Sequence, residues 1–143
     1  MSIAEEVAHK LGGVSTLGLD VRSQADLVVV VHNRLPLVAL KRLAETGFTE
    51  PEIERFVIPQ RTRRHRTERN QPLTVEESDR TVRLLRIQTL AEETFGNKDK
   101  AAAWLRRPLS ELGGEAPLAV AQTETGARLI ETLLAKISWG AAA

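Results

Sequence analysis

Cysteine and tyrosine are absent from the 143 residues, and all aromatic residues together make up only 3%. Without cysteine, a disulfide, a thiol nucleophile and a cysteine-based zinc site are excluded. Because aromatic residues are so few, the core must be built from Leu, Val, Ile and Ala. That composition favours helix packing over a β-sandwich.

Long apolar runs are missing as well. The longest, Leu27 to Val31, is far shorter than the roughly 20 residues needed to cross a bilayer. The opening MSIAEEVAHK carries acids and no apolar stretch of the kind found in secretory signals. We therefore expect a cytoplasmic protein with no membrane partner.

Histidine is scarce and scattered. His9, His32 and His65 lie far apart and show no HExxH spacing, so no metal site is predicted.

Nothing in the sequence assembles a catalytic group. Paired acids stand at 5–6, 76–77 and 92–93, at expected helix starts or on exposed helix faces, where carboxylates favour the helix dipole or solvent. Ser138 has no neighbouring base in the sequence, and no Gly-rich phosphate loop is present. We predict no catalytic residue, no cofactor and no enzyme activity.

Positive charge is concentrated in one short segment. The formal net charge is +1, yet the stretch PQRTRRHRTERN, residues 59–70, holds five arginines and a single glutamate. The rest of the chain is slightly acidic. This asymmetry is the first indication of a nucleic-acid partner.

The first half of the chain divides into an arm and helices. In residues 1–22 a short helix is possible before Gly12-Gly13, and we interpret the whole segment as an N-terminal arm. A helix is expected from Ser23 to about Leu35, although its LVVVV run is equally compatible with a strand on periodicity alone. Pro36 fits the first turn of the next helix, which Gly47 ends.

The segment FTEPEIERFVIPQRTRRHRTE predicts a helix-turn-helix. Thr49 and Glu52 form a capping box, and Pro59 ends the first helix at about Val57-Ile58. A second short helix then carries the arginines. Two short helices joined by a three-residue turn, with positive charge on the second, are typical of DNA-binding helix-turn-helix domains. We assign residues 23–70 to this domain.

Residues 71–143 are expected to form a second helical domain. A capping box at Thr74 opens a long helix to about Phe95, with Val75, Val82, Leu85 and Thr89 expected on one face. Gly96 ends that helix. The last helix starts near Thr123 or Glu124 and follows i, i+3, i+4, i+7 spacing to an expected end at Trp139-Gly140, with three alanines beyond.

The arginine helix supplies the candidate DNA-binding residues. In such a helix some side chains neutralise phosphates and one or two reach guanine edges. The alternative is an exposed, solvated linker between two helical halves. DNA is favoured over RNA because no aromatic residues are interleaved for base stacking. The candidate residues are Gln60, Arg61, Thr62, Arg63, Arg64 and Arg66.

The two tryptophans have different expected roles. Trp104, on an Ala-rich helix, is expected in the core rather than stacked on a ligand. Trp139 stands near the chain end, and docking on its own domain and docking on a partner remain equally open. Gly113-Gly114 is interpreted mainly as a tight turn, with close approach of a partner as the alternative.

A fixed-spacing motif links the second domain to a known family. The pattern A-x-x-W-L-x-x-P-x-x-x-L-G-G-x-x-P-L-x-x-x-x-T-x-x-G, here Ala101 through Gly126, resembles the toxin-binding domain of the Xre/MbcA/ParS antitoxins. The closing IETLLAKISWG resembles that family's end, and the G-F-T turn with its clustered arginines resembles its first half. The resemblance covers roughly residues 25–140. The family pattern places an apolar residue where this chain has Arg63, so the residue expected to pin the second helix is missing.

The resemblance implies a type II antitoxin with an Xre-like helix-turn-helix domain and a toxin-binding domain. Its partner would be a RES-domain toxin, of a family that consumes NAD or transfers from it, and the antitoxin itself would bind no NAD. Its C-terminal end would cover the toxin's active site. It would also dimerise and bind operator DNA to repress its own operon. The toxin-binding residues implied are Arg128, Lys136, Ser138, Trp139 and Gly140.

A second interpretation stays open. The chain could be a stand-alone helix-turn-helix regulator whose second half only dimerises or senses. A neighbouring gene for a RES-type toxin would distinguish the two.

Overall fold

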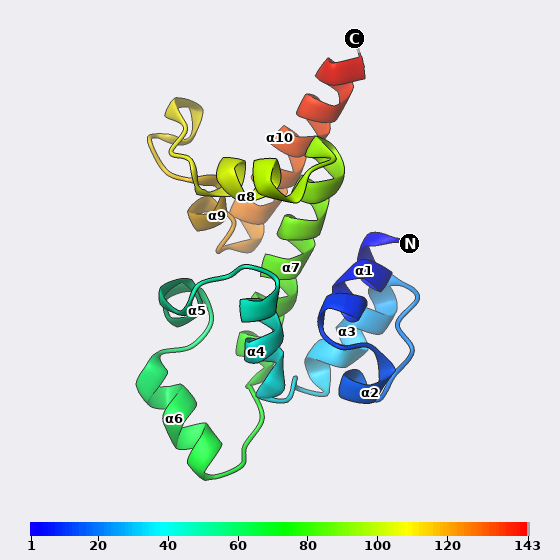
Figure 1. Ribbon diagram of the computed structural model, residues 1–143, viewed down its shortest axis with the longest axis vertical. Coiled ribbons are helices and arrows are strands. Elements are labelled where there is room, and N and C mark those ends of the chain that lie inside the picture. The colour runs from blue at the N-terminus through cyan, green and yellow to red at the C-terminus, as the bar shows by residue number, and fades with distance from the viewer. Residues whose placement is uncertain (143) are drawn as a thin grey trace. The chain divides into compact units, whose positions relative to one another are not determined.

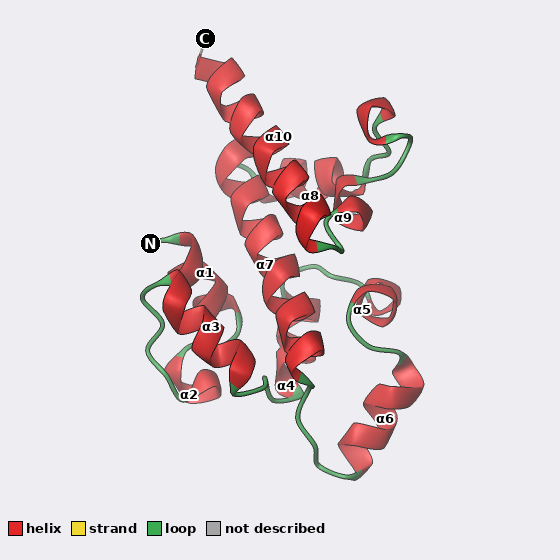
Figure 2. Cartoon of the chain, turned by 180° about the vertical axis from the view of Figure 1, so that it is seen from behind, coloured by secondary structure: helices red, strands yellow, loops and turns green. Residues whose placement is uncertain are grey.

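A computed structural model describes residues 1–142, and the side chains of residues 141 and 142 are left out of the description. All secondary structure in this range is helical, as Figure 2 shows. The prediction of an all-α chain is therefore confirmed. The helices are α1 (Ile3–Lys10), α2 (Val14–Leu17), α3 (Gln24–His32), α4 (Val38–Glu45), α5 (Glu50–Phe56), α6 (Gln60–Glu68), α7 (Val75–Phe95), α8 (Lys98–Arg106), the 3-10 turn η1 (Ser110–Leu112), α9 (Pro117–Val120) and α10 (Glu124–Ala142).

The chain forms two compact units, Met1–Leu85 and Arg86–Ala143. The sequence placed the division earlier, between residues 70 and 71. The difference arises because the start of α7 packs into the first unit. The Leu73 N–H donates to the Leu35 carbonyl (2.9 Å), and the Leu35 N–H donates to the Ser78 hydroxyl oxygen (2.8 Å). Leu73 and Ser78 are fully buried.

Residues 1–22 are part of the first unit instead of a separate arm. The Ser2 hydroxyl accepts from the Glu5 N–H and the Glu5 carboxylate accepts from the Ser2 N–H, a capping box that starts α1. Val7 and Leu11 are fully buried. Helices α1 and α3 lie side by side in Figures 1 and 2. The sequence shows the apolar face of α1 but not the helix that covers it.

Helix α3 settles the ambiguity between helix and strand. The Ser23 side chain accepts from the Asp26 N–H at its start, which satisfies one of the free donors of the first turn. Leu27 and Val30 are buried, while Val28 and Val29 are exposed. A helix that buries only one side of an LVVVV run explains why periodicity alone could not separate the two structures.

Helix α7 has the predicted bounds but not the predicted face throughout. It runs from Val75 to Phe95, and Gly96 follows with φ = 62°, a left-handed value that suits glycine. Val82, Leu85 and Thr89 are buried as expected. Val75 is exposed instead, although Glu77 and Ser78 in the same part of the helix are buried.

The second unit is built on the α8–η1–α9 connection and the last helix. Asn97 caps α8 by accepting from the Lys100 N–H (2.9 Å). Gly113 and Gly114 both have positive φ, so the tight-turn interpretation of this pair is confirmed. Pro117 then opens α9, where it is the first residue.

Helix α10 is longer than the sequence indicated. It continues through Trp139 and Gly140 to Ala142, whereas the sequence ended it at Trp139-Gly140. The reason is that Gly140 has an ordinary helical backbone and is not among the glycines of positive φ. The tail alanines at 141–143, expected beyond the helix, fall outside the side chains that the structure describes.

Candidate functional site

The first candidate site is the pair of helices α5 and α6. Thr49 starts α5 with the predicted capping box, in which its hydroxyl oxygen accepts from the Glu52 N–H and its own N–H donates to the Glu52 carboxylate. The turn that follows is apolar, with Val57 and Ile58 buried. Arg80 of α7 donates to the Val57 carbonyl (3.0 Å). This hydrogen bond fixes the turn to α7, and the turn determines where α6 begins.

Helix α6 itself has no buried residue. Two ion pairs fix it instead: Arg63 pairs with Glu50 of α5 at 2.8 Å, and Arg66 pairs with Glu77 at the start of α7. The Arg63–Glu50 pair thus joins α6 to α5. Because ion pairs and not buried apolar residues attach α6, its orientation is sensitive to the loss of either carboxylate, Glu50 or Glu77.

Glu77 is the better buried of these two carboxylates, with 6% of the residue exposed. It accepts from the guanidinium of Arg66 and from the Thr74 N–H (2.8 Å). Burial by itself raises the pKa of Glu77, but the hydrogen bonds from Arg66 and Thr74 outweigh it and leave the pKa below the ordinary 4.5. Glu77 is therefore a charged partner that ties α6 to α7.

Replacing Glu77 by glutamine is expected to lower the free energy of unfolding at pH 7 by about 1.5–3 kcal/mol, the range for hydrogen bonds to charged groups. Because the folded-state pKa of Glu77 lies below its unfolded value, its contribution is complete above the ordinary 4.5 and is lost as the pH falls further. Urea unfolding at pH 7 and at about pH 3 measures this. The difference between wild type and Glu77→Gln should be large at pH 7 and small at the acidic pH.

Glu76→Gln is the matched control, because Glu76 is an exposed acid in the same first turn of α7. It should change the free energy of unfolding by less than about 0.5 kcal/mol. Equal effects of the two substitutions would show that the Arg66–Glu77 pair does not hold α6.

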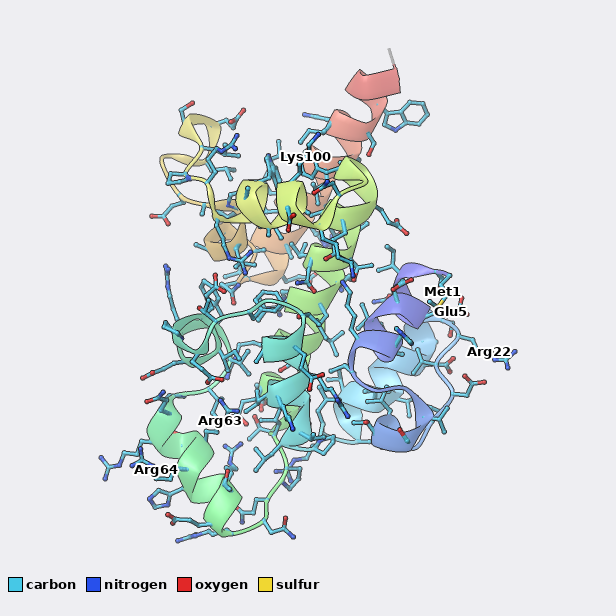
Figure 3. The ribbon with its side chains drawn as sticks, in the orientation of Figure 1. Met1, Glu5, Arg22, Arg63, Arg64 and Lys100 are labelled. Carbon is cyan, nitrogen blue, oxygen red and sulfur yellow. The ribbon has the colours of Figure 1, made fainter. Side chains whose placement is uncertain are left out.

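The six candidate DNA-binding residues have different surroundings. Gln60, Arg61 and Arg64 are exposed, and Thr62 is half-buried. Arg63 and Arg66 are the two that form ion pairs within the chain. Figure 3 shows Arg63 and Arg64 on different sides of α6. The sequence could not make this division, because Glu50 and Glu77 stand 13 and 11 residues from their arginines.

The second candidate site lies on α10. Arg128 is exposed and pairs with Glu124 one turn earlier (3.0 Å). Lys136, Ser138 and Gly140 are exposed too, and 78% of Trp139 is exposed. Since residues three and four apart share a helix face, Arg128 and Trp139 lie along the same side through Thr132 and Ala135. Ser138 lies on the exposed surface of α10 as well, but toward its edge, away from the line that joins Arg128 and Trp139.

The two glycines of α10 differ in what the fold demands of them. A Cβ on Gly126 would lie 1.7 Å from the Val120 carbonyl oxygen, so the close packing of α10 against the end of α9 requires glycine there. A Cβ on Gly140 would meet nothing within 4 Å. Glycine inside a helix costs roughly 1 kcal/mol relative to alanine. In the part of the chain that the structure describes, the fold gives no reason for a glycine at position 140.

The chain offers neither a metal cluster nor a membrane span in the part that the structure covers. Over residues 1–142, no three His, Asp or Glu side chains gather in a way that could hold a metal ion. Among the helices described, none combines the length and the apolar character needed to cross a bilayer.

Two family profiles match the chain in series. Residues 26–86 match the antitoxin Xre-like helix-turn-helix domain, which contains α5, α6 and the start of α7. Residues 90–140 match the antitoxin Xre/MbcA/ParS C-terminal toxin-binding domain, which contains α10 up to Gly140. The expectations of a helix-turn-helix half and a toxin-binding half are confirmed.

Curated relatives agree with the profiles. The chain is 40% identical to "Antitoxin Xre" of Pseudomonas putida over 71% of its own length and 64% of the relative's. It is 33% identical over half of its length to the "Prs ADP-ribosylating antitoxin" of a Sphingobium species, covering 51% of that protein. These alignments span less than two thirds of either relative.

A third relative is matched along most of both chains. The similarity to "Antitoxin Xre" of Photorhabdus laumondii is 30% identity over 87% of this chain and 86% of that protein. With both domains present in the same order, the chain belongs to the Xre/MbcA/ParS family of antitoxins, which are not enzymes.

Proposed function

We propose that this chain is the antitoxin of a type II toxin-antitoxin system and that it neutralises a RES-domain toxin. Its C-terminal region covers the entrance to the toxin's active site. The chain contributes no catalytic group and binds no NAD. Neutralisation is therefore steric, and it needs a firm helix that presents a protruding end.

The observation that carries this proposal is Trp139. It is a large aromatic residue on the last turns of a 19-residue helix, with 78% of its surface exposed, inside the segment matched to a toxin-binding domain. Aromatic side chains that pack on nothing in their own chain are typical of interface anchors. Gly140 beside it is free of any demand from the fold, which suits a backbone approached closely by a partner.

One relative supports a toxin that uses NAD. The Sphingobium relative carries the name "Prs ADP-ribosylating antitoxin", and the family resemblance points to RES-domain toxins, which consume NAD or transfer ADP-ribose from it. In the proposed complex Arg128, Lys136, Ser138, Trp139 and Gly140 contact the toxin. The two cations suit a site that receives an anionic dinucleotide.

The same chain binds operator DNA through α6 and represses its own operon. It does so as a homodimer within the toxin-antitoxin complex in the cytoplasm, since paired helix-turn-helix units read two half-sites one helical turn apart. Gln60, Arg61 and Arg64 are the exposed candidates for DNA contact. Arg63 and Arg66 are candidates as well, and in the free chain their ion pairs hold α6 in place.

Co-expression with the product of the neighbouring toxin gene tests the antitoxin role. We expect the full chain to co-purify with that product in a stable complex and to restore growth of cells that express it. A control strain expresses the toxin with residues 1–85 of the chain, which lack the toxin-binding domain and are expected to give no protection.

Absence of any complex, with growth arrest unchanged by the full chain, would refute the antitoxin role. Operator binding that persists in that case would favour the stand-alone regulator. The two functions are therefore separated by one pair of measurements.

A further inference from the structure

A groove opens on the second unit beside α10. Its volume is about 290 Å³, and it is lined by Trp104, Leu109, Glu111, Leu133, Lys136 and Ile137. These residues come from α8, from the η1 connection and from the last helix. Small-molecule and cofactor sites usually have roughly 300–1,000 Å³. A groove of this size is suited to one or two side chains rather than to a dinucleotide.

The apolar walls of the groove stay partly open to water. Trp104, Leu109, Leu133 and Ile137 are all half-buried, in contrast to the fully buried Ile130 on the same helix. The ring of Trp104 packs on the ring of Phe95, with the two ring centroids 5.6 Å apart. The groove is thus a firm apolar surface that the chain itself leaves uncovered.

The wall opposite α10 is held in place by hydrogen bonds within its own turn. The Leu109 N–H donates to the Glu115 carbonyl (3.1 Å), and the Gly114 N–H donates to the Leu109 carbonyl (2.9 Å). Figure 1 shows this segment, in yellow, extending away from α8 and α9. These hydrogen bonds hold the backbone of this turn in one conformation.

Opposite charges stand on the two sides of the groove. Glu111 lies on the turn and Lys136 on α10, and within residues 1–142 neither forms an ion pair. The apolar surface of the groove lies between an unpaired carboxylate and an unpaired ammonium group. Such a surface favours a partner that presents an apolar side chain with a group of opposite charge facing each of these two.

The toxin is the occupant that fits this surface. Lys136 lines the groove and stands about one turn from Trp139 on α10, so the groove and the exposed Trp139 lie close together along the same helix. All six lining residues lie within the segment matched to the toxin-binding domain. We propose that the groove receives an apolar side chain of the toxin, flanked by a basic group facing Glu111 and an acidic group facing Lys136. This inference rests on the proposed antitoxin function.

Two substitutions on the turn test the groove without altering α10. Leu109→Trp fills it, and Glu111→Lys reverses the charge on one wall. Each is expected to raise the dissociation constant for the toxin at least about tenfold, since anchoring residues in pockets dominate interface energies. Isothermal calorimetry with the full chain and a catalytically inactive form of the neighbouring toxin measures this, and thermal unfolding checks that each variant is folded.

Matched controls exist for both changes. Glu115→Lys makes the same charge change on the same turn outside the groove. Val14→Trp adds the same ring at a residue of α2 that is 55% exposed. Both should leave the dissociation constant within about twofold, as expected of surface substitutions away from an interface.

The outcomes separate the groove from the antitoxin function. If Trp139→Ala weakens toxin binding and the two groove variants do not, the groove inference is wrong and the antitoxin role stands. If the groove variants change the oligomeric state without changing toxin affinity, a second copy occupies the groove and the inference is equally wrong. If the wild type binds no toxin, the antitoxin role fails first. If Leu109→Trp does not fold, the dissociation constants of Glu111→Lys and Glu115→Lys for the toxin are compared, and equal values contradict the groove inference.

Discussion

Replacing Trp139 by alanine is expected to weaken binding to the toxin about 30-fold or more, which corresponds to about 2 kcal/mol or more at an aromatic hot spot. The free chain should lose almost no stability, because 78% of Trp139 is exposed. An affinity loss without a stability loss identifies an interface residue. Calorimetric titration with the toxin and thermal unfolding of the free variant measure the two quantities.

Val28→Ala is the control for this substitution. Val28 is a large apolar residue that is 51% exposed and lies outside the segment matched to the toxin-binding domain. It should leave toxin affinity unchanged.

Deletion of residues 138–143 removes the same contact completely and should restore growth arrest by the toxin while DNA binding stays intact. A truncated chain that protects cells normally would rule out coverage of the active site by this end.

Gly140→Ala refines the same test. Alanine in place of a helical glycine should stabilise α10 by up to about 1 kcal/mol, and the fold has open space for the added methyl group. If the toxin approaches the backbone there, affinity falls while stability rises. That opposite movement is hard to explain by damage to the fold. Unchanged affinity would show that Gly140 is not a point of close approach.

Local signals were sufficient to predict most of the helices. The capping box at Thr49 and Glu52 and the proline at 59 place α5 and the start of α6, because each acts on backbone groups within one turn. The 3.6-residue period marks α10 through Ile130 and Leu134, both buried. These features depend on neighbours in the sequence, and so a sequence reveals them.

Long-range contacts account for what the sequence could not show. The burial of Val7 and Leu11 depends on α3, and an amphipathic pattern does not say which element will cover it. The attachment of α6 depends on Glu50 and Glu77. A count of charges in the sequence does not distinguish these two carboxylates from the other acidic residues. The charge pattern of the segment marks Arg63 as a candidate DNA contact but does not show its ion pair with Glu50.

The end of α10 shows a different limit. Glycine after a helix usually adopts a left-handed conformation, as Gly96 does with φ = 62°, whereas Gly140, at the expected end of the last helix, lies within it. The glycine by itself does not distinguish a helix that stops from one that continues. What separates them is the chain that follows: Gly96 is followed by the Asn97 cap of α8, and Gly140 by alanines with high helix propensity.

Reversing Arg61 and Arg64 to glutamate is expected to reduce operator affinity about a hundredfold or more, on the order of 1.4 kcal/mol for each arginine. Both side chains are exposed on α6, and no ion pair occupies them in the part of the chain that the structure covers. The slope of log affinity against log salt should fall by about 2, because each arginine releases one counterion from a phosphate. Electrophoretic retardation of the promoter fragment at several salt concentrations measures both effects.

The design leaves Arg63 and Arg66 unchanged for a structural reason. Reversal at either position would set a carboxylate against Glu50 or Glu77, and a loss of DNA binding could then come from a displaced helix.

Lys98→Glu with Arg107→Glu makes the same change in net charge on exposed residues of the second unit, and its promoter affinity should stay within a few-fold of wild type. If the Arg61 and Arg64 double variant retains promoter binding and the full salt slope, α6 is not the DNA-reading helix. If the control loses affinity equally, overall charge and not α6 governs the binding.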